Sequence, residues 1–86
     1  RIPFGSLVEL GIIKPGTTIF DNKKKISAKI MADGSIKHAQ TEGSIHKVAA
    51  SILGAESCNG WTYWHYNLNG QIVPIDNLRQ RLISKN

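Results

Sequence analysis

Residues 41–54 carry the pattern that most restricts how this chain can fold. Apolar residues recur there at helical spacing, at Ile45, Val48, Ala49, Ile52 and Leu53. Ser44 stands directly before this stripe, where a side-chain oxygen caps a first turn, and Gly54 stands directly after it, where glycine ends helices. The sequence therefore predicts an amphipathic helix over 45–53 that packs by one face.

The rest of the chain alternates between strands and two further helices. Apolar alternation, or β-branched and aromatic residues, marks strands over 17–21, 26–32, 35–39, 61–66 and 71–75, and Asp33-Gly34 is a hairpin signal. Helices are predicted over about 3–10, before Gly11, and over 77–84. We expect one α+β domain over residues 1–86, with a small antiparallel sheet of about five strands and three helices.

The composition favours a polyanionic partner. Eleven Lys and Arg against six Asp and Glu give a net charge of +5 and a pI near 9.7, and nucleic acid is the first candidate. A small domain can also be basic for solubility alone, so charge leaves the question open. The lysine run 22–25 lies in a predicted turn and is interpreted as a solvated loop tip, which near DNA would add nonspecific attraction for phosphate.

Cysteine usage and the chain start indicate the setting of the domain. Its single cysteine, Cys58, can form neither an internal disulfide nor a CxxC zinc pair, which fits a reducing cytoplasm. No apolar run is long enough to span a bilayer, so no membrane partner is expected. Because the chain begins at Arg1 without a methionine, we expect a piece excised from a larger soluble protein.

The stretch Cys58-Asn-Gly-Trp-Thr-Tyr-Trp-His65 concentrates planar rings. A strand over 61–66 puts Trp61, Tyr63 and His65 on one face and Thr62, Trp64 and Tyr66 on the other. In a sheet covered on one side, one of these sets is exposed, and exposed rings in a basic domain favour stacking on bases. A sheet buried on both faces is the alternative, and we assign Trp64 to the core.

The predicted helix start and the ring-rich stretch together supply groups that suit DNA. Ser44, His46 and Lys47 lie beside unpaired backbone N–H groups at the positive end of the helix dipole, which binds phosphate. Asn59 can hydrogen-bond a base edge, Trp61 can stack on an unpaired base, and Arg79 in the last helix can hold a phosphate or base. The simpler alternative is that Ser44 only caps the helix and that His46 and Lys47 are ordinary surface residues.

Catalysis by this chain alone is not expected. Cys58 with His46 or His65 as base would make a thiol nucleophile, but a lone cysteine in a small domain is more often a packing residue. His38, His46, His65 and Cys58 share no metal-ligand spacing, and no glycine-rich phosphate loop is present. We therefore predict no catalytic, metal-binding or cofactor-binding residue, and a structural role for Cys58.

Five motifs, in one order along the chain, carry a family resemblance. They are Arg1-Ile-Pro-Phe-Gly, Leu10-Gly-Ile-Ile-Lys-Pro-Gly-Thr, Ala32-Asp-Gly-Ser, Gly43-Ser-Ile-His-Lys-Val and Cys58-Asn-Gly-Trp-Thr-Tyr-Trp-His. They resemble the C-terminal, RAMA-type domain of cell-cycle-regulated, GANTC-specific adenine-N6 DNA methyltransferases of the CcrM type. The resemblance runs from Arg1 to about Arg81 and is loosest over 67–71.

The resemblance implies a DNA-recognition domain at the C-terminal end of a larger methyltransferase. In such enzymes a separate catalytic domain binds S-adenosylmethionine, and a homodimer opens the recognition site so that bases are read strand-separated. By matching position, it implies DNA contacts at Ser44, His46, Lys47, Asn59, Trp61 and Arg79. The family's DPPY-type catalytic segment and its cofactor-binding glycine motif are absent here, so this fragment should neither bind the cofactor nor methylate.

A competing hypothesis comes from the same resemblance. RAMA domains also occur on proteins that are not methyltransferases, so the domain would then be a protein-interaction or dimerisation module. Trp61 separates the two hypotheses, because a base-stacking tryptophan is needed for DNA binding and an interaction module does not require it.

Overall fold

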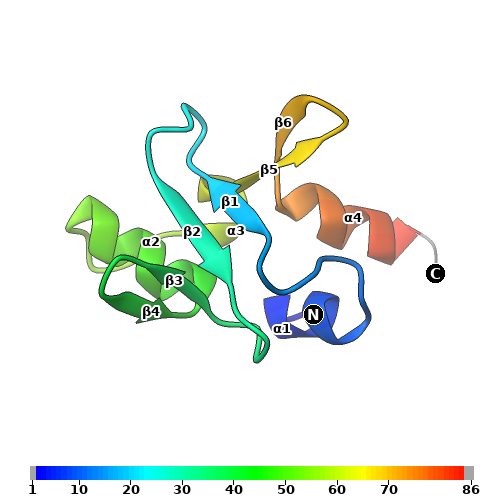
Figure 1. Cartoon of the computed structure of the whole chain (residues 1–86), viewed down its shortest axis with the longest axis horizontal. Coiled ribbons are helices and arrows are strands. Elements are labelled where there is room, and N and C mark those ends of the chain that lie inside the picture. Colours follow the sequence, from blue (N-terminus) through cyan, green and yellow to red (C-terminus); the bar gives the residue numbers. More distant parts are fainter. Residues whose placement is uncertain (1, 85–86) are drawn as a thin grey trace.

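The computed structural model describes residues 2–84, which form four helices and one six-stranded antiparallel sheet. In chain order the elements are α1 (Phe4–Glu9), β1 (Thr18–Phe20), β2 (Ser27–Ile30), β3 (Ile36–His38), β4 (Thr41–Gly43), α2 (Ile45–Leu53), α3 (Gly60–Tyr63), β5 (His65–Leu68), β6 (Gln71–Pro74) and α4 (Asp76–Ser84) (Figure 1). The strands lie in the order β4-β3-β2-β1-β5-β6. The predicted small α+β fold is confirmed.

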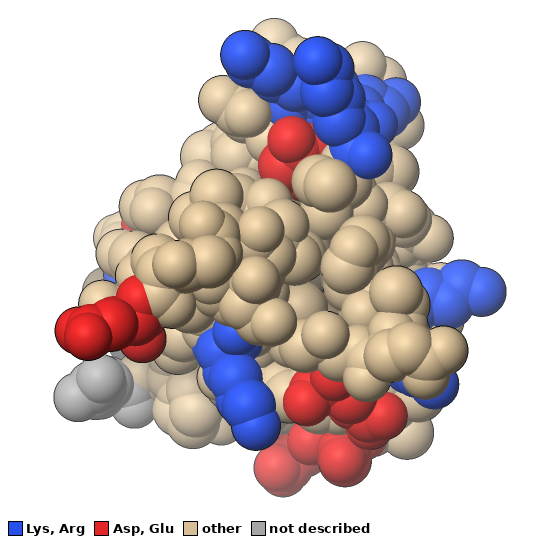
Figure 2. All heavy atoms as spheres, turned by 90° about the vertical axis from the view of Figure 1, so that its left-hand side faces the viewer, with Lys and Arg blue, Asp and Glu red and all other residues tan. Residues whose placement is uncertain are grey.

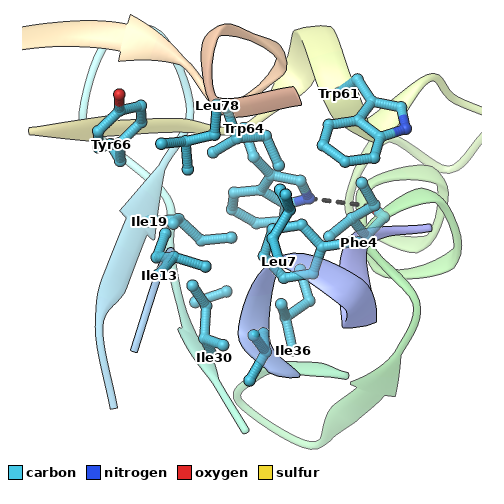
Figure 3. Packing of buried hydrophobic residues seen from close by; sticks show 14 of the residues in the cluster. Phe4, Leu7, Ile13, Ile19, Ile30, Ile36, Trp61, Trp64, Tyr66 and Leu78 are labelled. Atoms are coloured by element: carbon cyan, nitrogen blue, oxygen red, sulfur yellow. Dashed lines mark hydrogen bonds between the residues drawn. The ribbon is translucent and has the colours of Figure 1, made fainter. Parts of the chain in front are cut away.

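One face of the sheet carries the core. Ile19 of β1 pairs with Ala28 of β2, and Ile30 pairs with Ile36 of β3, and all four side chains are buried. Because opposite residues in an antiparallel pair share a face, these apolar side chains line one side of the sheet. Leu7 of α1, Val48 of α2 and Trp64 join the same cluster, part of which is drawn in Figure 3. The core thus lies between the sheet and the helices.

Helix α2 has the bounds that the sequence predicts. The Ser44 Oγ accepts a hydrogen bond from the Lys47 N–H at 3.0 Å, and Gly54 ends the helix in the left-handed conformation with φ of 67°. Ile45, Val48 and Ala49 are buried as expected. Leu53 is 56% exposed, so the buried stripe ends before the last turn, and the assignment of Leu53 to it is wrong.

The predicted strand over 61–66 is wrong in its first half. Gly60–Tyr63 forms the short helix α3, and the strand begins only at His65. The Asn59 Oδ1 accepts a hydrogen bond from the Trp61 N–H at 3.0 Å, and the Gly60 N–H donates to the His46 Nδ1 at 2.9 Å. Side chains therefore satisfy the first N–H groups of a helical turn and override the strand preference of the aromatic residues.

The sheet gains a strand that the sequence does not reveal. Thr41–Gly43 forms β4 by pairing with β3, with Ile36 opposite Gly43 and His38 opposite Thr41. The chain reverses between the two strands at Ala39, whose φ is 52°. Because β4 is short and ends in glycine, its sequence carries no strand pattern, and we predicted only a lead-in to the helix.

The terminal helices agree with the prediction over the described residues. The segments predicted at about 3–10 and 77–84 form α1 and α4, and Gly11 has a φ of 73° at the end of α1. Arg1, where the family resemblance begins, lies outside the described residues. Within residues 2–84, every helix is too short or too polar to span a bilayer.

Candidate nucleic-acid interface

A groove of about 930 Å³ forms where the start of α2 meets α1, α3, α4 and the β2–β3 turn. Five of the six side chains that we predict to contact DNA line this groove, namely Ser44, His46, Asn59, Trp61 and Arg79. Lys47 lines an adjoining hollow together with Ser44 and His46. The fold thus brings together, on one side of the molecule, residues that lie far apart in sequence.

The start of α2 supplies one edge of the groove. Ser44 is exposed, and its Oγ accepts from the Lys47 N–H, so the hydroxyl proton remains available for donation. The Lys47 side chain is exposed and passes over Gly43, because a Cβ at Gly43 would lie 3.0 Å from the Lys47 Cδ. Gly43 therefore leaves room for the lysine stem beside the helix N-terminus.

The hydrogen bond from Gly60 determines which His46 nitrogen carries the proton. The Gly60 N–H can only donate, so the His46 Nδ1 at 2.9 Å accepts and is unprotonated. The proton of the neutral ring then resides on Nε2. His46 is exposed, and it offers this Nε2–H as a donor to a partner.

Asn59 is oriented in the same way by its capping role. Its Oδ1 accepts the Trp61 N–H at 3.0 Å, which turns the Nδ2 amide away from the cap. The side chain is exposed at the groove, where the Nδ2 group offers two donors and Oδ1 keeps one lone pair. Local capping thus uses one acceptor site each on Ser44, His46 and Asn59 and leaves donor groups for a ligand.

The structure corrects the expected exposure of Trp61. The α3 turn packs its ring edge-on against Phe4, with centroids 5.9 Å apart, and the Arg79 guanidinium lies 4.5 Å from its ring centroid. Only 6% of Trp61 is exposed. Trp61 therefore forms the floor of the groove, and a base that stacks on the ring face held by Arg79 has to displace the guanidinium.

Arg79 is held by two contacts and keeps one unused donor. Its guanidinium pairs with the Asp76 carboxylate at 2.6 Å and stacks on Trp61. The Arg79 Nε is buried without a hydrogen-bond acceptor within residues 2–84. Because unsatisfied buried donors are uncommon, this N–H marks a cost of the packing, and it reaches an acceptor from outside only when the Arg79 side chain moves.

Of the remaining rings of the 58–66 segment, Trp64 and Tyr66 are buried in the core, and Tyr63 packs against it half-buried. Trp64 is fully buried, and its Nε1–H donates to the Ile45 carbonyl at 3.0 Å (Figure 3). Tyr66 is buried and donates from its hydroxyl to the Asn77 Oδ1. Tyr63 packs edge-on against Trp64, and burial raises the pKa of its hydroxyl. The prediction that Trp64 lies in the core is confirmed, and the expectation of an exposed aromatic face is wrong.

Cys58 lines the groove but shows no paired base. It is half-buried and packs against the core cluster. The His46 Nδ1 is occupied by the Gly60 N–H, and the His65 Nδ1 is engaged with the Tyr63 carbonyl at 3.0 Å. Among the described residues, neither histidine is hydrogen-bonded to the thiol.

Residues from α1 and the β2–β3 turn also line the groove, and we did not predict them as site residues. Pro3, Phe4 and Gly5 come from the first motif of the family resemblance, and Gly34 comes from the third. A Cβ at Gly34 would lie 2.6 Å from the Gly5 Cα, so the two segments are in backbone contact. In the sequence, the one indication that these residues belong to the site is that they lie within motifs of the family resemblance.

Comparison with known proteins identifies the family of the chain. A type II methyltransferase, M.HinfI of Haemophilus influenzae, is 30% identical over 79 residues, which cover 92% of this chain. The chain spans only 22% of the length of that methyltransferase. The family model described as Restriction Enzyme Adenine Methylase Associated, or RAMA, matches residues 1–86. The chain therefore belongs to the RAMA family.

Proposed function

We propose that this domain recognises DNA on behalf of an adenine-N6 DNA methyltransferase. The observation that carries the proposal is that Ser44, His46 and Asn59 all line one groove. Each of these side chains accepts a backbone N–H through one atom and keeps a donor group for a ligand. Lys47 and Arg79 add positive charge at its edge. Phosphate oxygens and base acceptors match such a donor-rich, cationic surface.

The family and the relative support a proposal for the parent protein. A RAMA domain with similarity to a type II methyltransferase, spanning a fifth of its length, is proposed to be the C-terminal part of a longer enzyme. Its catalytic domain would supply the S-adenosylmethionine site. We further propose a CcrM-type enzyme that acts as a homodimer on GANTC sites, and the sequence motifs support this.

Recognition of a strand-separated site fits the groove better than recognition of intact duplex grooves. The sequence carries no zinc finger, basic zipper or convincing helix-turn-helix, which are common duplex-reading motifs. The groove instead offers the Trp61 ring at its floor, the Arg79 guanidinium over that ring and the Asn59 amide at its rim. An unpaired base is proposed to enter there, contact Asn59, and stack with Trp61 or on the Arg79 guanidinium plane.

Two substitutions test the site without removing a cap. Lys47→Gln deletes one exposed charge. Asn59→Asp keeps the Oδ acceptor for the Trp61 N–H, removes the Nδ2 donors and adds a negative charge, so its effect on base recognition is read from the preference for GANTC over a scrambled site. Arg81→Gln is the matched control, since it removes an exposed charge from α4 outside the groove. Fluorescence anisotropy of the full-length enzyme would be measured on GANTC oligonucleotides in duplex, bubble and single-stranded form.

The expected results separate charge from base recognition. Lys47→Gln weakens binding to every oligonucleotide and reduces the slope of log affinity against log salt by about 0.9 per lost phosphate contact on duplex. Asn59→Asp weakens binding most on the bubble and reduces the preference for GANTC over a scrambled site. Affinities equal to that of the Arg81→Gln control for both variants would favour the protein-interaction alternative.

A further inference from the structure

The outward face of the sheet carries a second basic surface, separate from the groove. The register places Thr18, Lys29, Lys37 and Glu42 side by side across β1, β2, β3 and β4. Lys29 and Lys37 are exposed and directly opposite each other, and they line a shallow hollow with Thr18 and Ser27. The buried residues of these strands point the other way, toward the core.

The lysine run of the β1–β2 loop extends from one end of this face. Phe20 lies opposite Ser27 on the outward side, and the Lys24 Nζ lies 5.2 Å from the centroid of the Phe20 ring. Figure 2 shows Lys and Arg side chains gathered at the top of the molecule, at the height at which Figure 1 places the β1–β2 loop. We call Lys23, Lys24, Lys25, Lys29 and Lys37 the lysine face.

The loop that presents the run is held in one conformation. The Asp21 Oδ1 accepts from the Lys25 N–H at 2.7 Å and from the Ile26 N–H at 2.9 Å, and the Asp21 carbonyl accepts from the Lys24 N–H at 3.0 Å. Lys24 has a φ of 59°, which is unusual for a residue other than glycine. Lys23, Lys24 and Lys25 are exposed in this turn, as expected for a solvated loop tip, and their ammonium groups extend from an ordered backbone.

Folding gains nothing from opposing Lys29 and Lys37. Like charges opposite each other on neighbouring strands repel, and the one ion pair within residues 2–84 is that between Arg79 and Asp76. Glu42 lies beside Lys37 on the far side from Lys29, so a carboxylate flanks only one of the two lysines. A bound polyanion would neutralise both lysines at once.

We propose that the lysine face binds the sugar-phosphate backbone of duplex DNA outside the recognition site, without reading sequence. This proposal rests on the proposed function only in taking DNA as the partner. Lysine is a point-charge phosphate binder without base selectivity when it contacts the backbone. The groove confers site preference, and the lysine face adds affinity for any duplex.

The test removes the opposed lysines and compares them with a charge outside both surfaces. Binding of full-length Lys29→Gln/Lys37→Gln enzyme to a site-free duplex would be measured over a series of salt concentrations, beside wild type and Arg81→Gln. The double variant is expected to lower the slope of log affinity against log salt by about 0.9 per lost contact, and by about 1.8 if both contact phosphate. Arg81→Gln should leave the slope unchanged.

Each outcome bears on one surface. Equal fold-losses of the double variant on site-free and GANTC duplexes support the proposal, and a slope equal to that of wild type overturns it. The urea midpoint of the double variant should equal or exceed that of wild type, and a lower midpoint would contradict the claim that the lysines repel. If Lys47→Gln and Asn59→Asp change nothing while the double variant changes the slope, only the groove assignment fails.

Discussion

Gly60 is the position where one methyl group should disrupt the largest part of the site. A Cβ built on Gly60 would lie 2.6 Å from the Ile45 carbonyl carbon, 2.7 Å from its oxygen and 2.8 Å from its Cβ. Two of these atoms are backbone, so no rotamer change relieves the contact. Gly60→Ala must therefore push α3 away from the first turn of α2.

The displacement has a cost that follows from named contacts. Overpacking of a buried site costs about 1–3 kcal/mol. The Gly60 N–H bond to the His46 Nδ1 and the Trp64 Nε1–H bond to the Ile45 carbonyl both cross the same junction, and each contributes about 0.5–1.5 kcal/mol. We expect Gly60→Ala to lower the free energy of unfolding by about 2–6 kcal/mol.

Urea unfolding followed by tryptophan fluorescence measures this loss, with Gly5→Ala as the matched control. A Cβ at Gly5 would meet the Asp33 carbonyl oxygen and the Gly34 Cα at 3.9 and 4.0 Å, which are ordinary contact distances. Within α1 this substitution should be neutral or stabilising by up to about 1 kcal/mol. If Gly60→Ala unfolds at the same urea concentration as Gly5→Ala, the close approach of α3 to α2 is refuted.

Three further substitutions probe single interactions. Ser44→Ala removes the α2 cap and should lower the free energy of unfolding by about 1 kcal/mol in a urea titration. Trp64→Phe removes the indole donor from the buried Ile45 carbonyl and opens a void, and the expected loss is about 2–4 kcal/mol by the same measurement. Hydrogen bonds from Ser35 lower the pKa of the exposed Asp33 carboxyl; Ser35→Ala should raise that pKa toward 3.8, followed by NMR titration. Because the folded pKa is lowered, Asp33 stabilises the fold above its ordinary pKa and loses this contribution as pH falls, and the variant should lose less.

The parts of the fold that the sequence predicts are those in which local signals agree. For α2, the cap at Ser44, the apolar spacing and Gly54 all indicate one helix, and the structure has it at the predicted bounds. For α3 the signals conflict. Aromatic residues favour a strand, whereas the Asn59 cap and a hydrogen bond from Gly60 to His46, fourteen positions away, favour a turn. The second of these is a tertiary contact, which no local pattern contains.

The same distinction applies to the candidate site. Ser44, His46 and Lys47 could be assigned from sequence because their geometry follows from a helix start. The placement of Trp61 under Arg79 depends on how α3 and α4 pack. Sequence periodicity placed Trp61 on an exposed strand face, where its ring would be free to stack on a base. In the structure the Trp61 ring is instead covered and forms the floor of the groove.

The site residues also stabilise the fold, and this determines how their function can be tested. Ser44, His46 and Asn59 each accept a backbone N–H that would otherwise be unpaired. Alanine at any of them removes a backbone N–H acceptor and a proposed DNA donor together, so a loss of binding would not reveal which of the two mattered. Substitutions that keep the accepting atom separate these contributions. Asn59→Asp retains the cap but adds a negative charge, which weakens binding to every sequence by repelling phosphate. A lower preference for GANTC over a scrambled site therefore reports recognition, provided that the urea midpoint of the variant stays near that of wild type.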